Sequence, residues 1–572
     1  MDETDRSHED RGEPEIPSPS VPLKSEARFE DLFPVLTPAQ IDRIASRGIR
    51  RATARGEVLA APGARHSPFF VVTKGYLEVV RQSPVDEELL VVYRPGQFTG
   101  EASMVSGRGG IVLIRSGAPG EVIEVERERM LALLRQDGEL GEILMRAFLL
   151  RRVELVAQGR GDVVVAGSNH CASTLRVKEF LTRNGHPYTF LDLDEDAAAQ
   201  GLLDGFHITV SDVPVVIRRG DPILKNPTNE EIAERLGFNE DVDPSHVRDV
   251  VVIGAGPAGL AAALSGASEG LDVLVLETSS PGGQAGSSPK IENYLGFPMG
   301  ISGRELAARA YDQAQKFGAE MLVAKKAKRL SCDRKPYRVE LDDGTSVPAR
   351  AILIATGVRY RKLSLPNASR FEGVGLYHSA TFLEAQLCRD EEVIVVGGGN
   401  SAGQAAVFLA QIARHVHLLV RTSGLVESMS RYLIRRIEDN PGITLRTRTE
   451  IVGLQGDAHL EQVTFENVSD GAVDSRPIRH VFLMTGADPG TDWLEGCVAV
   501  DEKGFLKTGS DLTPDDLAAA VWPPGRAPYL LETSRPGVFA IGDVRSGSVK
   551  RVASAVGEGS IAIAFVHRVL NG

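Results

Sequence analysis

The sequence has few cysteines, no C-x-x-C pair, no block of lysine and arginine, and one long uncharged stretch. The four cysteines are Cys171, Cys332, Cys388 and Cys497. Because they are widely scattered, they signal neither a disulfide framework nor a zinc site, and we expect most of them to be buried, inert thiols. The formal net charge of −13 leaves no broad basic field for a phosphate backbone, which argues against nucleic acid as a partner.

No segment has the pattern of a signal peptide or a membrane anchor. Residues 1–27 are acidic, contain proline and serine, and have no apolar run, which is typical of a disordered tail. Residues 250–268 are long enough to cross a membrane, but their glycines follow a nucleotide-binding pattern. We therefore expect a cytoplasmic protein with no membrane partner. A length of 572 residues predicts three or four modules, since one core does not grow that large.

Residues 28–158 predict a small antiparallel β-roll with helices. Short β-like runs broken by glycine lie between Gly56 and Phe98. Helical patterns flank these runs at residues 38–47, 128–135 and 140–155. This order of elements, together with the pair Gly100-Glu101, resembles the cyclic-nucleotide-binding domain.

The resemblance implies a phosphate cassette. In that family the glutamate holds the ribose hydroxyl, and an arginine nine or ten residues later pairs with the cyclic phosphate. Glu101 matches, but Gly110 and Ile111 occupy the arginine positions, and Arg108 comes too early. A buried phosphate without this cation would lose a charge-assisted pair. We therefore expect a scaffold or a sensor of an unknown ligand, with a retained cyclic-nucleotide site as the alternative.

Residues 161–240 predict a further small α/β domain. The patterns indicate strands at 162–166, 188–193 and 211–217, and helices at 175–184 and 230–236. This order resembles glutaredoxin and thioredoxin. In that comparison Val213-Pro214 falls at the cis-proline of the family, and Cys171 falls at the first cysteine of its C-x-x-C motif.

Cys171 is the candidate catalytic residue of this domain. Its position at a helix N-terminus would lower the pKa of the thiol and favour the thiolate. Thr174 replaces the second cysteine, and a lone thiol cannot resolve a mixed disulfide by itself. The alternative is a redox-inactive adaptor domain in which the cysteine is incidental.

The strongest motif is G-x-G-x-x-G at Gly254, Gly256 and Gly259. A strand pattern precedes it, a helix pattern follows it, and Glu277 ends the next strand. The first glycine makes the tight turn, the second admits a pyrophosphate, and the third lets the helix pack on the strand. The helix N-terminus favours the anion, and Glu277 is placed to bind ribose hydroxyls. This pattern predicts a Rossmann-like dinucleotide site.

A second copy of the motif has Gly397, Gly399 and Ala402 at the corresponding positions. Two nucleotide folds in one chain indicate hydride transfer between a nicotinamide and a flavin, because this is the simplest chemistry that joins them. The next strand ends at Arg421, with Arg431 nearby. An arginine suits the 2′-phosphate of NADPH, although NADH stays possible.

From residue 248 to the end, the chain resembles the low-molecular-weight thioredoxin reductases. The matching blocks are Gly282-Gly-Gln284, Ile291-Glu-Asn293-Tyr-Leu-Gly-Phe-Pro298, Ala355-Thr-Gly357, Gly397-Gly-Gly-Asn-Ser-Ala402 and Gly537-Val-Phe-Ala-Ile-Gly-Asp543. The resemblance implies that Gln284, Asn293 and Asp543 contact FAD, and that the segment Lys550-Arg-Val552 lies beside the flavin. It also implies homodimers in which the nicotinamide domain rotates.

The same resemblance implies an FAD-binding domain split into residues 248–366 and 481–572, with an NAD(P)H-binding domain at 367–480 between them. We therefore expect a multidomain α+β and α/β protein. It would contain a β-roll with helices, a thioredoxin-like domain, and two Rossmann-like domains for FAD and NAD(P).

One departure from the family concerns the electron acceptor. Ser379 and Phe382 stand where the family has the cysteines of its redox-active C-A-T-C motif, and Cys388 is single and out of register. The internal dithiol relay is therefore absent. We expect NADPH to reduce FAD, and a thiol/disulfide substrate or small redox protein to be reduced next, with Cys171 as the candidate relay. The alternatives are electron transfer to ferredoxin, a quinone or oxygen, and a sensor that does not turn over.

Overall fold

The computed structural model describes residues 29–571 except 65–66, 83–86, 101–103, 106–109, 111, 159–162, 195–207, 219–220, 428 and 458. The predicted tail, together with Glu101, Arg108 and Ile111 of the predicted phosphate cassette, lies outside the described residues. The chain divides into two compact units. One unit comprises residues 1–104 and 109–162, and the other comprises 105–108 and 163–572.

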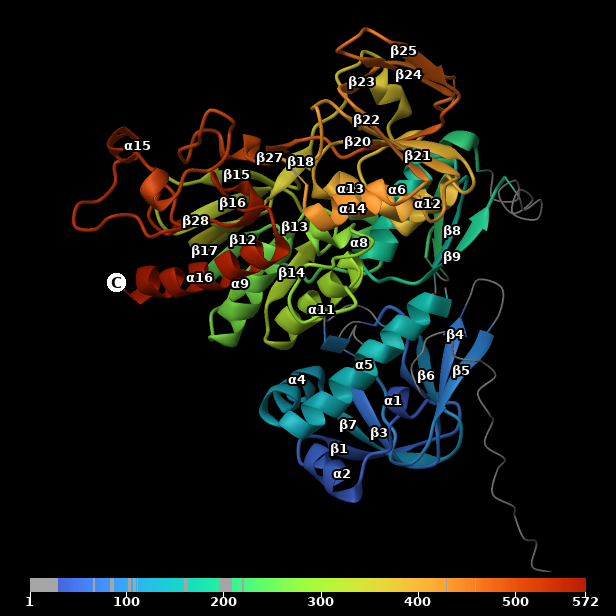
Figure 1. Ribbon diagram of the computed structural model, residues 1–572. Helices are drawn as coiled ribbons and strands as arrows, with labels where there is room; N and C mark the ends of the chain where they lie inside the picture. The colour runs from blue at the N-terminus through green and yellow to red at the C-terminus, as the bar shows by residue number, and fades with distance from the viewer. Residues whose placement is uncertain are drawn as a thin grey trace, which may run out of the picture. The chain divides into compact units, whose positions relative to one another are not determined.

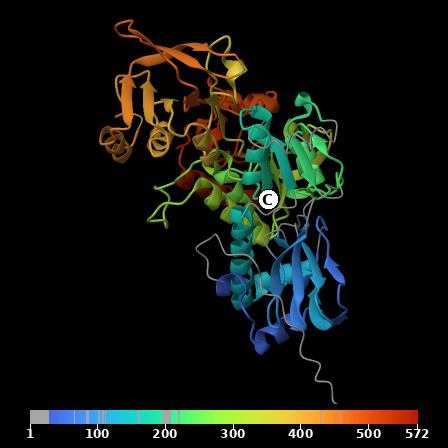
Figure 2. The same cartoon turned by 90° about the vertical axis from the view of Figure 1, so that its right-hand side faces the viewer.

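The first unit contains the predicted roll, in which two antiparallel sheets pack with helices (Figure 2). One sheet has the order β1 (Ile49–Thr53), β7 (Gly120–Val125), β3 (Phe69–Lys74). The other has the order β2 (Val58–Ala60), β6 (Leu113–Ser116), β4 (Leu77–Gln82), β5 (Glu87–Tyr93). The helices are α1 (Phe29–Leu32), α2 (Pro38–Ala45), α4 (Arg127–Gln136) and α5 (Gly138–Gln158). Contacts between the buried rings of Phe69, Phe98 and Phe148 join the roll to α5.

The second unit begins with a small mixed sheet. Its elements are β8 (Val163–Gly167), α6 (Ala172–Arg183), β9 (Tyr188–Asp192), η1 (Val210–Asp212), β10 (Val215–Arg218), β11 (Leu224–Lys225) and α8 (Asn229–Arg235). The strand order is β11-β10-β8-β9, with β8 and β9 parallel and β10 antiparallel to both of its neighbours. The Val213-Pro214 peptide bond is cis. We call residues 163–240 the fused domain.

A larger α/β module follows, built around a mainly parallel sheet of seven strands within the described residues. The sheet order is β14 (Glu320–Val323), β13 (Val273–Glu277), β12 (Arg248–Ile253), β17 (Ser346–Ile354), β16 (Tyr337–Leu341), β15 (Ala327–Ser331), and β28 (Val538–Ala540) pairs with β17. Its helices are α9 (Pro257–Ser268), α10 (Gly283–Gly286), α11 (Gly303–Lys316), α15 (Pro514–Ala519) and α16 (Val552–Asn571), with short turns η3 (Asp492–Leu494), η4 (Gly509–Asp511) and η5 (Gly542–Val544). Helix α16 packs along α9 (Figure 1).

A second α/β module is inserted between the two segments of the first. Its parallel sheet has the order β19 (Leu376–Tyr377), β26 (His480–Leu483), β20 (Glu392–Val396), β21 (His415–Val420), β22 (Ile443–Thr447). The helical elements are η2 (Ala368–Phe371), α12 (Phe382–Leu387), α13 (Asn400–Leu409) and α14 (Arg431–Glu438). Strands β23 (Thr449–Gln455), β24 (Gln462–Asn467) and β25 (Val473–Arg476) form a separate antiparallel sheet. Because β26 belongs to the parallel sheet, residues 481–483 lie in the inserted module, although the sequence placed them in the other one.

The two modules are joined by a ribbon of two antiparallel strands, β18 (Val358–Tyr360) and β27 (Ala487–Pro489). Strand β18 leads into the inserted module and β27 leads out of it. Both connections therefore lie side by side.

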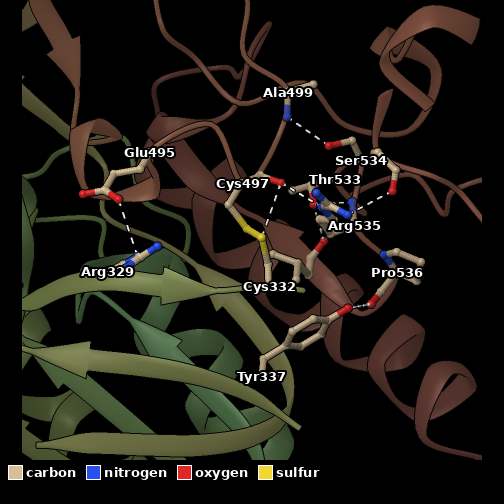
Figure 3. The surroundings of a disulfide bond; sticks show 12 residues. Arg329, Cys332, Tyr337, Glu495, Cys497, Ala499, Thr533, Ser534, Arg535 and Pro536 are labelled. Carbon is tan, nitrogen blue, oxygen red and sulfur yellow. Dashed lines mark hydrogen bonds and ion pairs between the residues drawn. A yellow bond between two sulfur atoms is a disulfide. The ribbon is translucent and has the colours of Figure 1, made fainter. Parts of the chain in front are cut away.

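The prediction that the cysteines form no disulfide is wrong for one pair. Cys332, directly after β15, is bonded to Cys497, which follows η3 (Figure 3). The two residues are separated by 165 positions, and the loop that they close contains the whole inserted module. Local cysteine spacing carries no information on such a contact, because it is made only when the two segments of one module pack together.

Helix α16 is long and apolar enough to span a membrane by length and composition alone. One such helix is weak evidence of a membrane span, because a core helix of the same length passes the same test. Its residues Ala555, Gly559, Ala562, Ile563 and Val566 are buried in the structure.

Candidate functional site

A cleft of about 1970 Å³ runs through the second unit. Both α/β modules and the fused domain contribute to its lining. Among the residues singled out from the sequence, the lining includes Gly254, Gly256, Glu277, Gln284, Asn293, Gly397, Gly399, Arg421, Asp543 and Val552. Gly259, Ala402 and Cys171 are outside this lining.

The first glycine turn has the geometry that a bound dinucleotide needs. Gly254 has a φ of +106°, and a Cβ there would lie 2.4 Å from the carbonyl oxygen of Ala355. Gly256 is the N-cap of α9, and the nearest protein atom to a Cβ at this position would be the Cα of Gly283, at 4.0 Å. The backbone at Gly256 is therefore open on the side of the cleft, where free N–H groups of α9 can meet a pyrophosphate.

Glu277 ends β13 and has only 7% of its surface exposed. One carboxylate oxygen accepts the N–H of Ala255 at 2.8 Å, and the other accepts the N–H of Ser279 at 2.9 Å. These two bonds hold the carboxylate against the glycine turn. A carboxylate fixed there retains lone pairs for the hydroxyls of a ribose.

The second half of this module contributes η5, which carries Asp543. Glu558 of α16 accepts the N–H of Gly542 at 2.7 Å and pairs with Arg545 at 2.6 Å, so both ends of the turn are anchored. Burial raises the pKa of Asp543. The ammonium of Lys550 donates to the backbone oxygen of Asp543 at 3.1 Å, and burial lowers the pKa of this lysine.

The inserted module repeats the glycine turn at the start of α13. Gly397 has a φ of +142°, and a Cβ there would lie 2.3 Å from the carbonyl oxygen of Met484. Gly399 is the N-cap of α13 and has no atom within 4 Å of its Cβ position. Ala402 is fully buried in the core of the module, which explains why it does not reach the cleft.

Arg421 follows β21 directly and is exposed at the cleft. Within the described residues, its guanidinium makes no ion pair or hydrogen bond. A cation at the end of this strand is free to meet a phosphate on the ribose of a bound nucleotide.

The fused domain forms one wall of the cleft through Ala172, Leu175, Arg176, Glu179 and Arg183 of α6. Cys171 is the N-cap of this helix and is partly exposed. A Cβ on Gly373 would lie 2.9 Å from the Cβ of Ala172, so the start of α6 touches the inserted module. Leu175 packs against the core that contains Tyr377, Ala380 and Ala385.

The segment that lacks the family's dithiol lies in this same contact region. Ser379 lines the cleft and donates to Glu384 at 3.4 Å, whereas Phe382 is 62% exposed. Burial raises the pKa of Glu384. Burial also raises the pKa of Cys388 to about 12, and its thiol donates to the carbonyl of Ala385. Cys388 is therefore a protonated core thiol.

Two dinucleotide-binding turns that open into one cleft define a flavin- and nicotinamide-dependent oxidoreductase. The open backbone at Gly256 and the fixed carboxylate of Glu277 fit the pyrophosphate and ribose of FAD. The open Gly399 turn and the free Arg421 fit NADPH.

The comparisons with known proteins agree with this class. Residues 248–559 match the model of the pyridine nucleotide-disulphide oxidoreductases, and residues 50–137 match the cyclic nucleotide-binding domain. The chain is 32% identical to the thioredoxin reductase of Mycolicibacterium smegmatis over 324 residues, which cover 57% of this chain and 97% of that protein. The protein therefore belongs to the pyridine nucleotide-disulphide oxidoreductase family, and it is an NAD(P)H-dependent FAD oxidoreductase of the thioredoxin reductase type.

Solved structures agree as well. The thioredoxin reductase of Lactococcus lactis in its FR conformation has a TM-score of 0.50 at 28% identity, over 56% of this chain and 99% of that one. The thioredoxin reductase of T. acidophilum has a TM-score of 0.51 at 26% identity, over 57% and 99%. FAD and NADPH are accordingly the cofactors of this protein. The match at residues 50–137 shows that the reductase also carries an N-terminal domain of the cyclic nucleotide-binding family.

The residues that the fused domain contributes to the cleft could not be predicted from the sequence. The same is true of Glu558, which holds η5 in place. No local motif marks these residues, because a helix such as α6 has the same pattern whether it faces a cleft or solvent.

Proposed function

We propose that this flavoenzyme reduces a disulfide of a small redox protein or a small thiol compound, and that Cys171 of the fused domain replaces the missing dithiol. The fused domain would then be a glutaredoxin/thioredoxin-like domain, which its strand order and strand directions support. The observation that carries the proposal is the contact between the start of α6 and the segment around Ser379. Cys171, which is partly exposed, precedes Ala172, the residue of α6 that meets the inserted module at Gly373.

NADPH is the only reductant that the proposed reaction requires. The Cys171 thiolate attacks a substrate disulfide, a new S–S bond forms, and one substrate thiolate leaves. Two electrons that originate from NADPH then cleave this mixed disulfide, and solvent supplies the protons for the thiols. Bound FAD supplies the chemistry that accepts a hydride from NADPH and passes the electron pair on.

In this proposal Gly254, Gly256, Glu277, Gln284, Asn293, Asp543 and Val552 hold FAD, and Gly397, Gly399 and Arg421 hold NADPH. Ala402, which was also predicted to bind this nucleotide, is buried in the core of the module and does not reach the cleft. Gln284 donates its side-chain amide to the carbonyl of Val358 at 2.9 Å, which leaves its own oxygen for the flavin. The domain limits stay those predicted from the sequence, except that β26 goes with the inserted module.

We further propose a homodimer in the cytoplasm. The loop between Ile291 and Ile301 presents Leu295, 94% exposed, and Met299, 82% exposed. Apolar side chains so fully in solvent support an interface with a second copy. We propose that the roll is a scaffold or a sensor of an unknown ligand, and not a site that binds a cyclic nucleotide tightly, since Gly110 occupies one of the positions expected for the phosphate-binding arginine.

The decisive experiment is anaerobic reduction by NADPH, followed by challenge with thioredoxin, glutathione disulfide, ferredoxin, a quinone and oxygen in turn. Cys171→Ser should keep the NADPH-driven loss of flavin absorbance and lose disulfide turnover, while Cys388→Ser should keep both. Undiminished disulfide turnover in Cys171→Ser would remove Cys171 from the mechanism. Turnover with ferredoxin, quinone or oxygen alone would replace the disulfide as acceptor, and a single round of reduction without turnover would indicate a sensor.

A further inference from the structure

The last residue of α6, Arg183, reaches across from the fused domain to the FAD module. Its guanidinium donates to the carbonyl oxygen of Gly283 at 2.8 Å. The neighbouring Asn184 donates its side-chain amide to the carbonyl of Ser279 at 3.3 Å. The end of α6 is therefore attached to the loop 279–283, which belongs to the predicted flavin site.

This loop lies directly against the first glycine turn. A Cβ on Gly283 would lie 3.0 Å from the Cα of Gly256, the residue at which the backbone opens for a pyrophosphate. Arg183, Gly256 and Gly283 all line the same cleft. Arg183 therefore contacts Gly283, and Gly283 in turn lies against Gly256 at the N-terminus of α9.

The Arg183 side chain is partly desolvated, and its guanidinium has more N–H donors than its bonds to Glu179 and Gly283 use. Only 18% of it is exposed, and it pairs with Glu179 at 3.3 Å. Its Nε is buried and has no hydrogen-bond partner in the described part of the chain. Each terminal nitrogen of the guanidinium carries a second N–H besides the one that Glu179 or Gly283 accepts, and a cation with such donors in the cleft lining, beside an anion-binding helix N-terminus, is suited to a phosphate.

Other contacts fix the fused domain in this position. The side chain of Asn239 exchanges two 2.8 Å hydrogen bonds with the backbone of Val323, at the end of β14. Lys325 pairs with Glu230 of α8. Because the domain is held at both places, α6 presents Arg183 to the cleft from a rigid support.

We propose that Arg183 is a ligand of the FAD pyrophosphate, so that the fused domain completes the FAD site. The N–H groups at the start of α9 and the guanidinium of Arg183 would both offer positive charge to the pyrophosphate in this part of the cleft. Removal of the cation weakens FAD binding whatever the electron acceptor is. FAD binding by Arg183 therefore does not depend on the proposed role of Cys171.

The test measures the dissociation constant of FAD with apoprotein, by the change in flavin fluorescence on reconstitution. Arg183→Gln should weaken FAD binding about ten- to a hundred-fold, the range expected for loss of a charge-assisted hydrogen bond. Arg183→Lys should retain most of the affinity, because it keeps the charge. The salt dependence of FAD binding should become shallower in Arg183→Gln.

Lys178→Gln is the matched control. Lys178 is a cation on the same helix, but its ammonium contacts Asn169 and the ring of Phe190, away from the cleft lining. This variant should bind FAD like the parent protein, and circular dichroism of each apoprotein checks the fold. Unchanged FAD affinity in Arg183→Gln, or equal losses in Arg183→Gln and Arg183→Lys or in Lys178→Gln, would overturn the proposal.

Discussion

A methyl group on Gly259 would lie 1.8 Å from the carbonyl oxygen of Gly254, whereas one on Gly256 would meet no protein atom closer than 4.0 Å. The two glycines of one motif therefore have different roles: Gly259 allows close packing of the chain, and Gly256 leaves space for a ligand. We expect Gly259→Ala to push α9 off β12 and prevent folding of the module. Gly256→Ala should fold and lose FAD affinity at least ten-fold, because its methyl group enters the space of the pyrophosphate.

Both variants are checked by FAD content after purification and by thermal unfolding of the apoprotein. Gly557→Ala is a suitable control, because its Cβ position has no neighbour within 4 Å. Gly256→Ala that binds FAD as tightly as the parent would show that the pyrophosphate does not lie at this turn.

Arg421 should decide the choice of nicotinamide nucleotide. Its guanidinium is exposed at the cleft and makes no ion pair within the described ranges. Arg421→Gln should raise the KM for NADPH about ten- to a hundred-fold and leave the KM for NADH nearly unchanged, since only NADPH carries the 2′-phosphate. Steady-state kinetics with both nucleotides measure the ratio. Arg431→Gln serves as the control, because Arg431 begins α14 and does not line the cleft. An equal effect of both variants on the KM for NADPH would rule out a specific role for Arg421.

The sequence predicted the two nucleotide modules well because their chemistry is local. A strand, a glycine turn and a helix N-terminus lie within about fifteen residues in the motif at Gly254, and Glu277 follows at the end of the next strand. The same holds for the turn at Gly397. Each of these features is dictated by backbone sterics that a short segment determines by itself.

The sequence could not show how distant segments meet. The contact of Arg183 with Gly283 joins residues 100 positions apart, and the disulfide joins residues 165 positions apart. Neither contact leaves a periodic pattern, because each depends on the packing of whole modules. The boundary near β26 was misplaced for a similar reason, since a strand joins its sheet through hydrogen bonds to neighbours that are remote in sequence.

The thiols should differ sharply in reactivity. Under native, non-reducing conditions iodoacetamide should label the partly exposed Cys171 and leave Cys388 unlabelled, because Cys388 is fully buried and burial raises its pKa to about 12. After denaturation without reductant, both of these residues should react. Cys332 and Cys497 should react only when a reductant is added. Peptide mass spectrometry reads all four sites, and native labelling of Cys388 would contradict the buried, protonated thiol.

The disulfide should stabilise the FAD module through the size of the loop that it closes. Cross-linking residues 165 positions apart restricts the unfolded chain, and the chain-entropy relation gives a stabilisation of up to about 5 kcal/mol. The double variant Cys332→Ser, Cys497→Ser should therefore unfold at a lower urea concentration, with FAD release as the probe. The exposed ion pair of Arg329 with Glu495 spans the same junction and is too weak to compensate (Figure 3). Dithiothreitol should lower the stability of the parent protein to that of the double variant and leave the double variant itself unchanged. A parent protein that is equally stable with and without reductant would contradict this role of the bond.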